Sequence, residues 1–205
     1  MPARNTIKIY ASEQYYHVYN RGANKQTVFH EASDYQYFFY LLKRHLSNKP
    51  AFDSHGREYR HLREKIEIVV FCLMPNHFHI LLYTHTETGM ELLMRSLITA
   101  YSMYYNKKYE HSGHVFQGAY KASLIDSDKY LQHISRYIHL NPKDYKNYPY
   151  SSYFHSVKKF NTEWIGNKLF TDVFQGTIQD YENFVADYSD YNETLKLFST
   201  ELADS

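Results

Sequence analysis

Two histidines stand one residue apart in the sequence MPNHFHILL, at the start of an apolar segment. In a β-strand, residues i and i+2 project from the same face, so His77 and His79 would point together while Phe78 points to the opposite face. Two neighbouring imidazoles can offer two nitrogens to one divalent metal ion. Histidines that form only hydrogen bonds would show the same spacing, so the metal hypothesis needs a third ligand from another part of the chain.

The segment RYIHLNP supplies a candidate third ligand and a candidate nucleophile. If this part of the chain is helical, Leu131, Ile134 and Ile138 form an apolar stripe. Tyr137 and Asn141 then lie one turn apart on an adjoining stripe, at the border of the core. A phenol beside an amide is usually structural, but it acquires a chemical meaning if this helix lies against the two histidines.

Together these residues predict a site for metal-dependent phosphoryl transfer. The metal ion would bind His77, His79 and the amide oxygen of Asn141, and Tyr137 would attack the phosphorus of a bound phosphate. Because a free tyrosine has a pKa of about 10, the metal would have to polarise the phosphate for this attack to proceed. Three tyrosines with no amide residue four positions later are weaker alternatives for the nucleophile: Tyr101, Tyr104 and Tyr105.

The pattern of apolar and turn-forming residues predicts the elements that position this site. We expect strands at residues 15–22, 66–74 and 77–84, and a strand or extended segment within 111–125. We expect helices at residues 33–46, with Ser33 as N-cap, and at residues 86–109, 126–141 and about 177–188. This order predicts an α+β domain with a mainly antiparallel sheet and helices packed on it.

The charge of the chain is divided unevenly along its length. Residues 1–160 carry 21 Lys and Arg against 13 Asp and Glu, whereas residues 161–205 carry 2 against 9. We therefore expect a basic domain over residues 1–160 and an acidic, helical C-terminal extension over residues 161–205. A basic surface favours polyanions such as nucleic acid, because phosphate contacts release counterions.

The single cysteine, Cys72, excludes an intramolecular disulfide and suggests a reducing compartment. The N-terminal segment lacks the apolar stretch of a signal peptide, and the longest purely apolar run covers only residues 68–74. We expect a soluble, cytoplasmic protein that does not interact with membranes.

Several segments between residues 15 and 153 resemble the REP-associated tyrosine transposases, within the single-tyrosine HUH transposase superfamily. The two most specific blocks are Met-Pro-Asn-His-x-His and Arg-Tyr-Ile-His-Leu-Asn-Pro, in this order. The full set of matching segments is YYHVYNRGANKQTVF, FCLMPNHFHILL, GHVFQGAYKASLIDSDKYL, RYIHLNP and YPYSSY.

This resemblance implies an HUH endonuclease with a ferredoxin-like sheet and helices on one face. His77 and His79 would be the paired ligands of Mg²⁺ or Mn²⁺, Asn141 the third ligand and Tyr137 the catalytic nucleophile. Tyr137 would attack a phosphodiester of single-stranded DNA, forming a 5′-phosphotyrosine and a free 3′-OH, and the strand would later be rejoined. The resemblance also implies recognition of palindromic DNA hairpins, by a monomer or a homodimer.

Six further residues are candidates for DNA contacts by their charge or position. Arg21 and Lys25 lie in and after the turn of the first strand, where a solvated turn would look the same. Three more flank Gly118, whose missing side chain permits close backbone approach. The candidates are Arg21, Lys25, Gln117, Tyr120, Lys121 and Arg136. The continuation NPKDYKNY is less basic than the resemblance implies, which weakens the prediction of DNA contacts there but not that of the metal ligands and the tyrosine.

Other readings of the same residues remain open. His114 is interpreted as structural or DNA-proximal, and so is His139, which is rotated by about 200° from Tyr137 on an ideal helix. The two histidines would also suit a phosphodiester hydrolase that uses water as nucleophile, although Leu81 stands where a histidine-triad hydrolase has its third histidine. A third reading is a hairpin-DNA-binding protein without catalysis.

Overall fold

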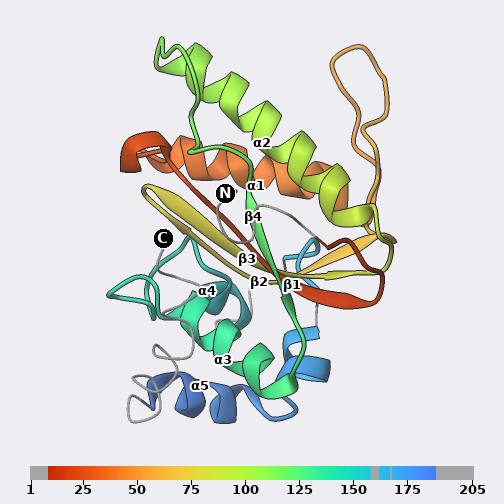
Figure 1. Ribbon diagram of the computed structural model, residues 1–205, viewed down its shortest axis with the longest axis vertical. Coiled ribbons are helices and arrows are strands. Elements are labelled where there is room, and N and C mark those ends of the chain that lie inside the picture. The colour runs from red at the N-terminus through yellow and green to blue at the C-terminus, as the bar shows by residue number, and fades with distance from the viewer. Residues whose placement is uncertain (1–8, 158–161, 167, 188–205) are drawn as a thin grey trace.

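The computed structural model describes residues 9–157, 162–166 and 168–187 (Figure 1). Four strands form one sheet in the order β2-β3-β1-β4, and every neighbouring pair is antiparallel. The strands are β1 (Gln14–Arg21), β2 (Ile66–Met74), β3 (His77–Thr84) and β4 (Lys121–Ile125). With α1 (Ala32–Leu46) between β1 and β2 and α2 (Gly89–Lys108) between β3 and β4, this is the antiparallel α+β sheet that the residue pattern predicts and the ferredoxin-like arrangement that the family resemblance implies.

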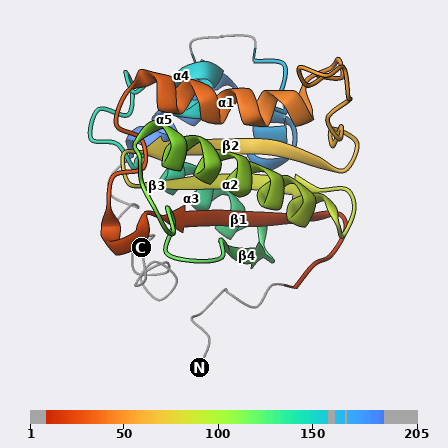
Figure 2. The same ribbon diagram turned by 90° about the horizontal axis from the view of Figure 1, so that it is seen from above.

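Helices cover both faces of the sheet, as Figures 1 and 2 show. The helices α1 and α2 pack together on one face. The helices α3 (Asp128–His139), α4 (Ser152–Val157) and α5 (Ile178–Ala186) lie on the other, with the π-helical turn η2 (Leu169–Val173). The expectation of helices on one face only is therefore wrong. Because the central strands carry apolar side chains on both sides, each face must be covered.

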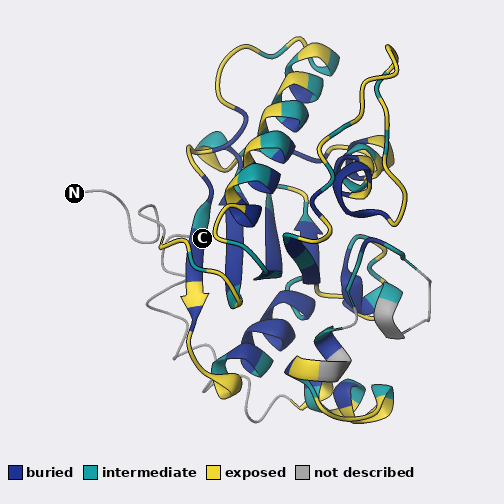
Figure 3. Ribbon diagram, turned by 90° about the vertical axis from the view of Figure 1, so that its right-hand side faces the viewer, coloured by how far each residue is buried: buried dark blue, intermediate teal, exposed yellow. Residues whose placement is uncertain are grey.

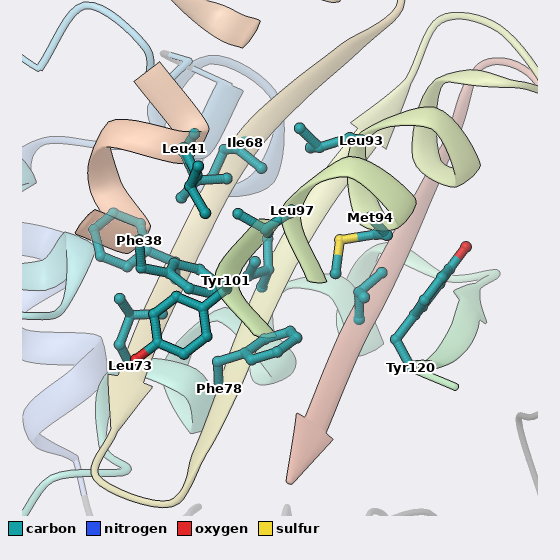
Figure 4. Close-up of a cluster of buried hydrophobic side chains, with 14 of the residues drawn as sticks. Phe38, Leu41, Ile68, Leu73, Phe78, Leu93, Met94, Leu97, Tyr101 and Tyr120 are labelled. Carbon is teal, nitrogen blue, oxygen red and sulfur yellow. The ribbon is translucent and has the colours of Figure 1, made fainter. Parts of the chain in front are cut away.

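The larger core lies between the sheet and the helices α1 and α2 (Figure 4). Phe38 and Leu41 of α1 and Leu97 and Tyr101 of α2 are fully buried there against Phe78 of β3. Ile80 and Leu82 follow Phe78 at two-residue spacing and join the same cluster, so this alternation assigns the even-numbered residues of β3 to the α1 and α2 side. The odd-numbered residues, including both histidines, must face α3.

The smaller core lies between the sheet and α3. Leu131, Ile134 and Ile138 are buried here, which confirms the predicted apolar stripe of this helix. The C-terminal elements complete the cluster with Leu169, Val173, Tyr181 and Val185. The division at residue 160 stays a prediction, but these four side chains share a core with α3. Helix α5 ends at Ala186, and residue 188 of the predicted helix lies outside the described residues.

The N-cap of α1 differs from the predicted one, and the turn after β1 depends on a glycine. Helix α1 is capped by Glu31 rather than Ser33, because the side chain of Asp34 accepts the backbone N–H of Glu31 in a reciprocal capping box. Gly22 follows β1, and a Cβ atom at this position would meet the carbonyl oxygen of Gln26 at 2.2 Å. Only glycine therefore permits the short 3-10 turn η1 (Ala23–Lys25) directly beside the end of β1.

Burial follows this layered arrangement (Figure 3). The central strands β1 and β3 are buried over most of their length, whereas Leu124 of the edge strand β4 is exposed. None of the described helices is long and apolar enough to cross a membrane.

Candidate active site

The two histidines of MPNHFHILL point to the same face of the sheet, towards α3. His77 and His79 belong to β3, and their ring centroids are 5.0 Å apart. The side chain of Phe78 between them lies in the opposite core, as the two-residue period predicts. His79 is only 1% exposed, whereas His77 is partly exposed at the end of the strand.

Helix α3 brings the tyrosine and the amide of RYIHLNP to this pair. The ring of Tyr137 meets the ring of His79 edge-on, with 5.4 Å between the centroids, and Tyr137 is 9% exposed. Asn141 follows the end of α3, and its Oδ1 lies 3.1 Å from Nε2 of His77. All four residues selected from the two sequence blocks therefore lie together between β3 and α3.

The orientation of His79 is set by a third histidine. Nδ1 of His79 lies 2.9 Å from Nε2 of His17, which belongs to the neighbouring strand β1. If Nδ1 of His79 carries the proton of this hydrogen bond, its Nε2 has a free lone pair. That Nε2 atom is buried and has no hydrogen-bond partner among the described residues.

His77 is held in a similar way by its sequence neighbour. Its Nδ1 lies 2.6 Å from Oδ1 of Asn76, an acceptor, so Nδ1 carries a proton and donates it. In the neutral ring, Nε2 is then an acceptor that faces another acceptor, Oδ1 of Asn141. A cation between these two atoms would remove their repulsion, and an amide flip of Asn141 would also do so.

Burial keeps these imidazoles neutral. Loss of solvent lowers the pKa of His79 well below the usual 6.5, and the nearby His17 and His77 lower it further. Burial also lowers the pKa of His77, against the hydrogen bond to Asn141, which raises it. Burial lowers the pKa of His17 to about 3. Neutral imidazole is the form that binds metal ions.

These residues fit a divalent metal ion better than they fit a purely structural role. An unpartnered buried ring nitrogen is costly unless something binds it, and Nε2 of His79 is such an atom. Two nitrogen ligands and one amide oxygen leave positions open for a phosphate. The described residues contain no cluster of three or more His, Cys, Asp or Glu arranged to hold a metal, and the amide of Asn141 beside His77 is the candidate for a third ligand.

Positive side chains lie on the same face of the sheet beside the histidines. Arg21 of β1 is paired with His77, and its charge contributes to the lowered pKa of His77. Nε of Arg21 is buried without a hydrogen-bond partner among the described residues. Lys121 of β4 is paired with Tyr19, and its Nζ lies 5.8 Å from the centre of that ring.

Two other candidates for DNA contacts lie at the end of β1 and expose their side chains. Lys25 is exposed in the turn η1, and its carbonyl oxygen accepts a hydrogen bond from the side chain of Asn76. Gln117 is also exposed, and its backbone N–H donates to the carbonyl oxygen of Arg21. The turn and the segment before β4 are therefore adjacent to the histidines.

The structure contradicts a DNA-contact role for Arg136. Its side chain is 0% exposed, and its guanidinium donates to the carbonyl oxygens of Phe184 and Asp187 and to His133. The guanidinium also lies 4.5 Å from the centre of the Phe184 ring. The sequence-based prediction of a surface charge is wrong because α5, almost 50 residues later in the chain, folds over Arg136.

Tyr120 is also unsuited to the contact predicted for it. Its side chain is buried in the α1 and α2 core, on the face opposite Tyr137, and its hydroxyl lies 3.2 Å from that of Tyr10 (Figure 4). The alternative nucleophiles on α2 pack on that same face: Tyr101, Tyr104 and Tyr105. Of the four tyrosines considered as nucleophiles, Tyr137 is therefore the one beside the histidines, although Tyr19 of β1 also stacks on His79 with 5.9 Å between the ring centroids.

His139 does face away from Tyr137, as the helical rotation predicts. It is buried, with Nδ1 2.7 Å from the hydroxyl of Tyr181 and Nε2 2.8 Å from Oγ of Ser152. His114 is exposed in the segment before β4. Two site residues that sequence reasoning missed are His17 and Asn76. The two-residue period of β1 places Tyr15, His17 and Tyr19 on one face of the strand and could have identified His17 as a candidate. That this face lies beside His79 follows only from the register of β1 against β3.

Fold and site together define an α+β protein in which two strand histidines meet a helix tyrosine and an amide. A family model described as "Transposase IS200 like" matches residues 10–141, which include all four of these residues. The match covers more than half of the chain, and the chain therefore belongs to this family of transposases.

A comparison with solved structures shows the shared fold. The structure of a REP-associated tyrosine transposase bound to a REP hairpin matches with a TM-score of 0.54 and 14% sequence identity, over 78% of this chain and 90% of that chain. The tRNA(His) guanylyltransferase of Saccharomyces cerevisiae matches with a TM-score of 0.39 and 9% identity, over 96% of this chain and 80% of that chain. The second similarity is too low to support a conclusion. A search among curated proteins gave no match.

Proposed function

We propose that this transposase cleaves and rejoins hairpin-forming single-stranded DNA through a covalent 5′-phosphotyrosine at Tyr137. The observation that carries the proposal is the buried, unpartnered Nε2 of His79, beside the ring of Tyr137 and the pair formed by His77 and Asn141. Membership of the transposase family supports DNA as the substrate. The hairpin is inferred from the solved relative, which is bound to one.

His77, His79 and Asn141 would hold a Mg²⁺ or Mn²⁺ ion. When bound, the ion would neutralise charge on the scissile phosphate and make its phosphorus more electrophilic. The side chain of Asn76 fixes the ring of His77, and His17 fixes that of His79, so both ligand nitrogens are oriented before the ion binds. This preorganisation is what a precise ligand geometry requires.

Tyr137 would act as the nucleophile in the cleavage step. Its phenolic oxygen forms a bond to phosphorus and loses its proton to solvent, while the bond from phosphorus to the 3′ oxygen breaks and that oxygen takes up a proton. The products are a 5′-phosphotyrosine and a free 3′-OH. Attack by a 3′-OH on the phosphotyrosine reverses the step and rejoins a strand, with no net change in the number of phosphodiester bonds.

Arg21 and Lys121 would bind the backbone phosphates of the strand that enters the site. Both lie on the same face of the sheet as the histidines, and Nε of Arg21 has an unused hydrogen-bonding position. Lys25 and Gln117 would extend this contact along the end of β1. The proposal holds for a monomer or a homodimer, because every residue it uses comes from one chain.

The test is to incubate the full chain with Mn²⁺ and a hairpin-containing single strand labelled on the 3′ side of candidate cleavage sites. We expect a labelled protein band that resists SDS, and we expect Tyr137→Phe to abolish it. Tyr130→Phe, in the same helix, is the matched control and should retain the adduct. Cleavage with no adduct would indicate hydrolysis by water, and an unchanged adduct in Tyr137→Phe would refute the choice of nucleophile.

A further inference from the structure

A cavity lined by both apolar and charged side chains lies on the opposite side of the sheet from Tyr137. It has a volume of about 610 Å³ and opens between the end of α1, residues 58–62 and α2. Figure 1 shows the long segment that joins α1 to β2 extending beside α2 at this position. The volume falls within the range of about 300–1,000 Å³ that is usual for small-molecule sites.

The cavity contains a buried positive charge. Arg44 is only 9% exposed, and its guanidinium donates to Nε2 of His45 and to Oγ of Ser96, both at 3.1 Å. The guanidinium also lies 4.6 Å from the centre of the Tyr59 ring. All three partners are uncharged, and no carboxylate of the described residues forms an ion pair with Arg44. A buried guanidinium normally has an anionic partner, because desolvation of an unpaired charge is costly.

Two further arginines stand at the rim of the same cavity. Arg60 and Arg95 are exposed and line it, and Arg95 also makes an exposed contact of 3.5 Å with Glu91. Glu58 is the only carboxylate among the lining residues. Burial lowers the pKa of His45, and the surrounding arginines lower it further, so this histidine adds no charge. The cavity therefore has an excess of positive charge that suits an anion.

The remaining lining residues would suit a flat, less polar group beside that anion. The ring of Tyr59 and the side chains of Leu92, Ala100 and Met103 line the cavity, and Met103 is 69% exposed at its edge. Arginine binds phosphate with directed hydrogen bonds, and aromatic or apolar side chains accept the face of a nucleobase. A phosphate joined to a sugar and a base combines both features.

We propose that this cavity binds a nucleoside 5′-monophosphate unit, either as a free nucleotide or as one unit of a single DNA strand. Arg44 would bind the phosphate from inside, Arg60 and Arg95 would bind it from the rim, and the base would lie against the apolar edge. The site is separate from the histidines and Tyr137, since the sheet lies between them. Its occupancy does not depend on cleavage.

The first arm of the test uses deoxythymidine 5′-monophosphate and measures binding to the full chain by calorimetry in EDTA. We expect Arg60→Ala and Arg95→Ala to weaken binding about tenfold each. Both side chains are exposed, so these variants should fold. Arg57→Ala is the matched control, because Arg57 belongs to the same segment but does not line the cavity. His77→Ala should also leave nucleotide affinity unchanged, which separates this site from the proposed active site.

The second arm measures binding of a hairpin-free single-stranded oligonucleotide to Tyr137→Phe protein by fluorescence anisotropy. A larger loss of affinity in Arg60→Ala and Arg95→Ala than in Arg57→Ala identifies DNA as the source of the bound unit. A response in the nucleotide arm alone identifies free nucleotide. If neither arm separates the two rim variants from Arg57→Ala, the proposal is wrong, whatever the outcome of the cleavage experiment.

Discussion

Nδ1 of His79 lies 2.9 Å from Nε2 of His17, and both rings are buried in the face of the sheet that α3 covers. The two histidines are 62 residues apart in sequence and meet because β1 and β3 are paired in the sheet. With Nδ1 in this contact, Nε2 of His79 is the ring nitrogen that stays buried without a hydrogen bond among the described residues. The pairing of β1 with β3 therefore sets the orientation of the His79 ring.

His17→Phe should weaken metal binding although His17 is not itself a ligand. Phenylalanine fills a similar volume but cannot hold Nδ1 of His79, so the ring loses its fixed orientation and tautomer. Loss of such an outer partner typically costs roughly 10- to 100-fold in metal affinity. Titration of free Mn²⁺ followed by electron paramagnetic resonance measures the affinity directly. His17→Gln, which can still form a hydrogen bond, should recover part of the loss, and equal affinity in His17→Phe and the parent would exclude this role.

Mn²⁺ should stabilise the parent protein against heat. A ligand that binds only the folded state adds roughly 2.7 kcal/mol when its concentration is 100 times Kd. Differential scanning calorimetry with and without Mn²⁺ should show a higher Tm that EDTA reverses. Replacement of His77 or His79 with Ala should remove this shift. The exposed His114→Ala serves as control, and a persistent shift in both site variants would place the metal elsewhere.

Arg21→Ala should weaken binding of single-stranded DNA measured in EDTA. Each phosphate contact that is lost should reduce the slope of log K against log salt by about 0.7. Fluorescence anisotropy between low and moderate salt gives both the affinity and the slope. Lys107→Ala, an exposed cation of α2, should change neither. An identical slope for Arg21→Ala and the parent would show that Arg21 does not contact phosphate.

Arg136→Met should affect stability rather than DNA binding. It removes the hydrogen bonds of a fully buried guanidinium to two backbone carbonyls of the C-terminal segment and leaves those carbonyls without their donor. We expect a loss of about 2–4 kcal/mol in the free energy of unfolding. Urea denaturation measures it, and anisotropy on the folded protein should show unchanged DNA affinity. Unchanged stability together with weaker DNA binding would show that Arg136 contacts DNA.

His139 should make the protein less stable in acid. Burial lowers its pKa in the folded state to about 3, against an ordinary value of 6.5. Between these values the unfolded state binds the additional proton, so stability falls as pH decreases from about 6.5 towards 3, by about 1.4 kcal/mol per pH unit for this one group. Urea denaturation at pH 7 and pH 5 should show a smaller pH dependence for His139→Gln than for the parent. Equal dependence would mean that His139 is not buried in its neutral form.

Local periodicity predicted much of the fold and selected the main residues of the site. The two-residue period of β3 placed His77 and His79 on one face. The helical period predicted for residues 126–141 placed Tyr137 near Asn141, although α3 ends at His139, two residues before Asn141. The predicted order of strands and helices was also that of the ferredoxin-like sheet. These features depend on neighbours within about one turn or one pleat, so a single sequence contains them.

Contacts between distant segments decided the rest. Only the tertiary structure shows that α3 covers the histidine face, that His17 holds His79, and that α5 buries Arg136. Only the tertiary structure shows that Tyr120 lies in the opposite core and that three separate segments line the cavity around Arg44. The sequence by itself determined which side chains share a face of their own element. Which faces meet depends on strand order, register and the path of the C-terminal chain, and local patterns do not specify these.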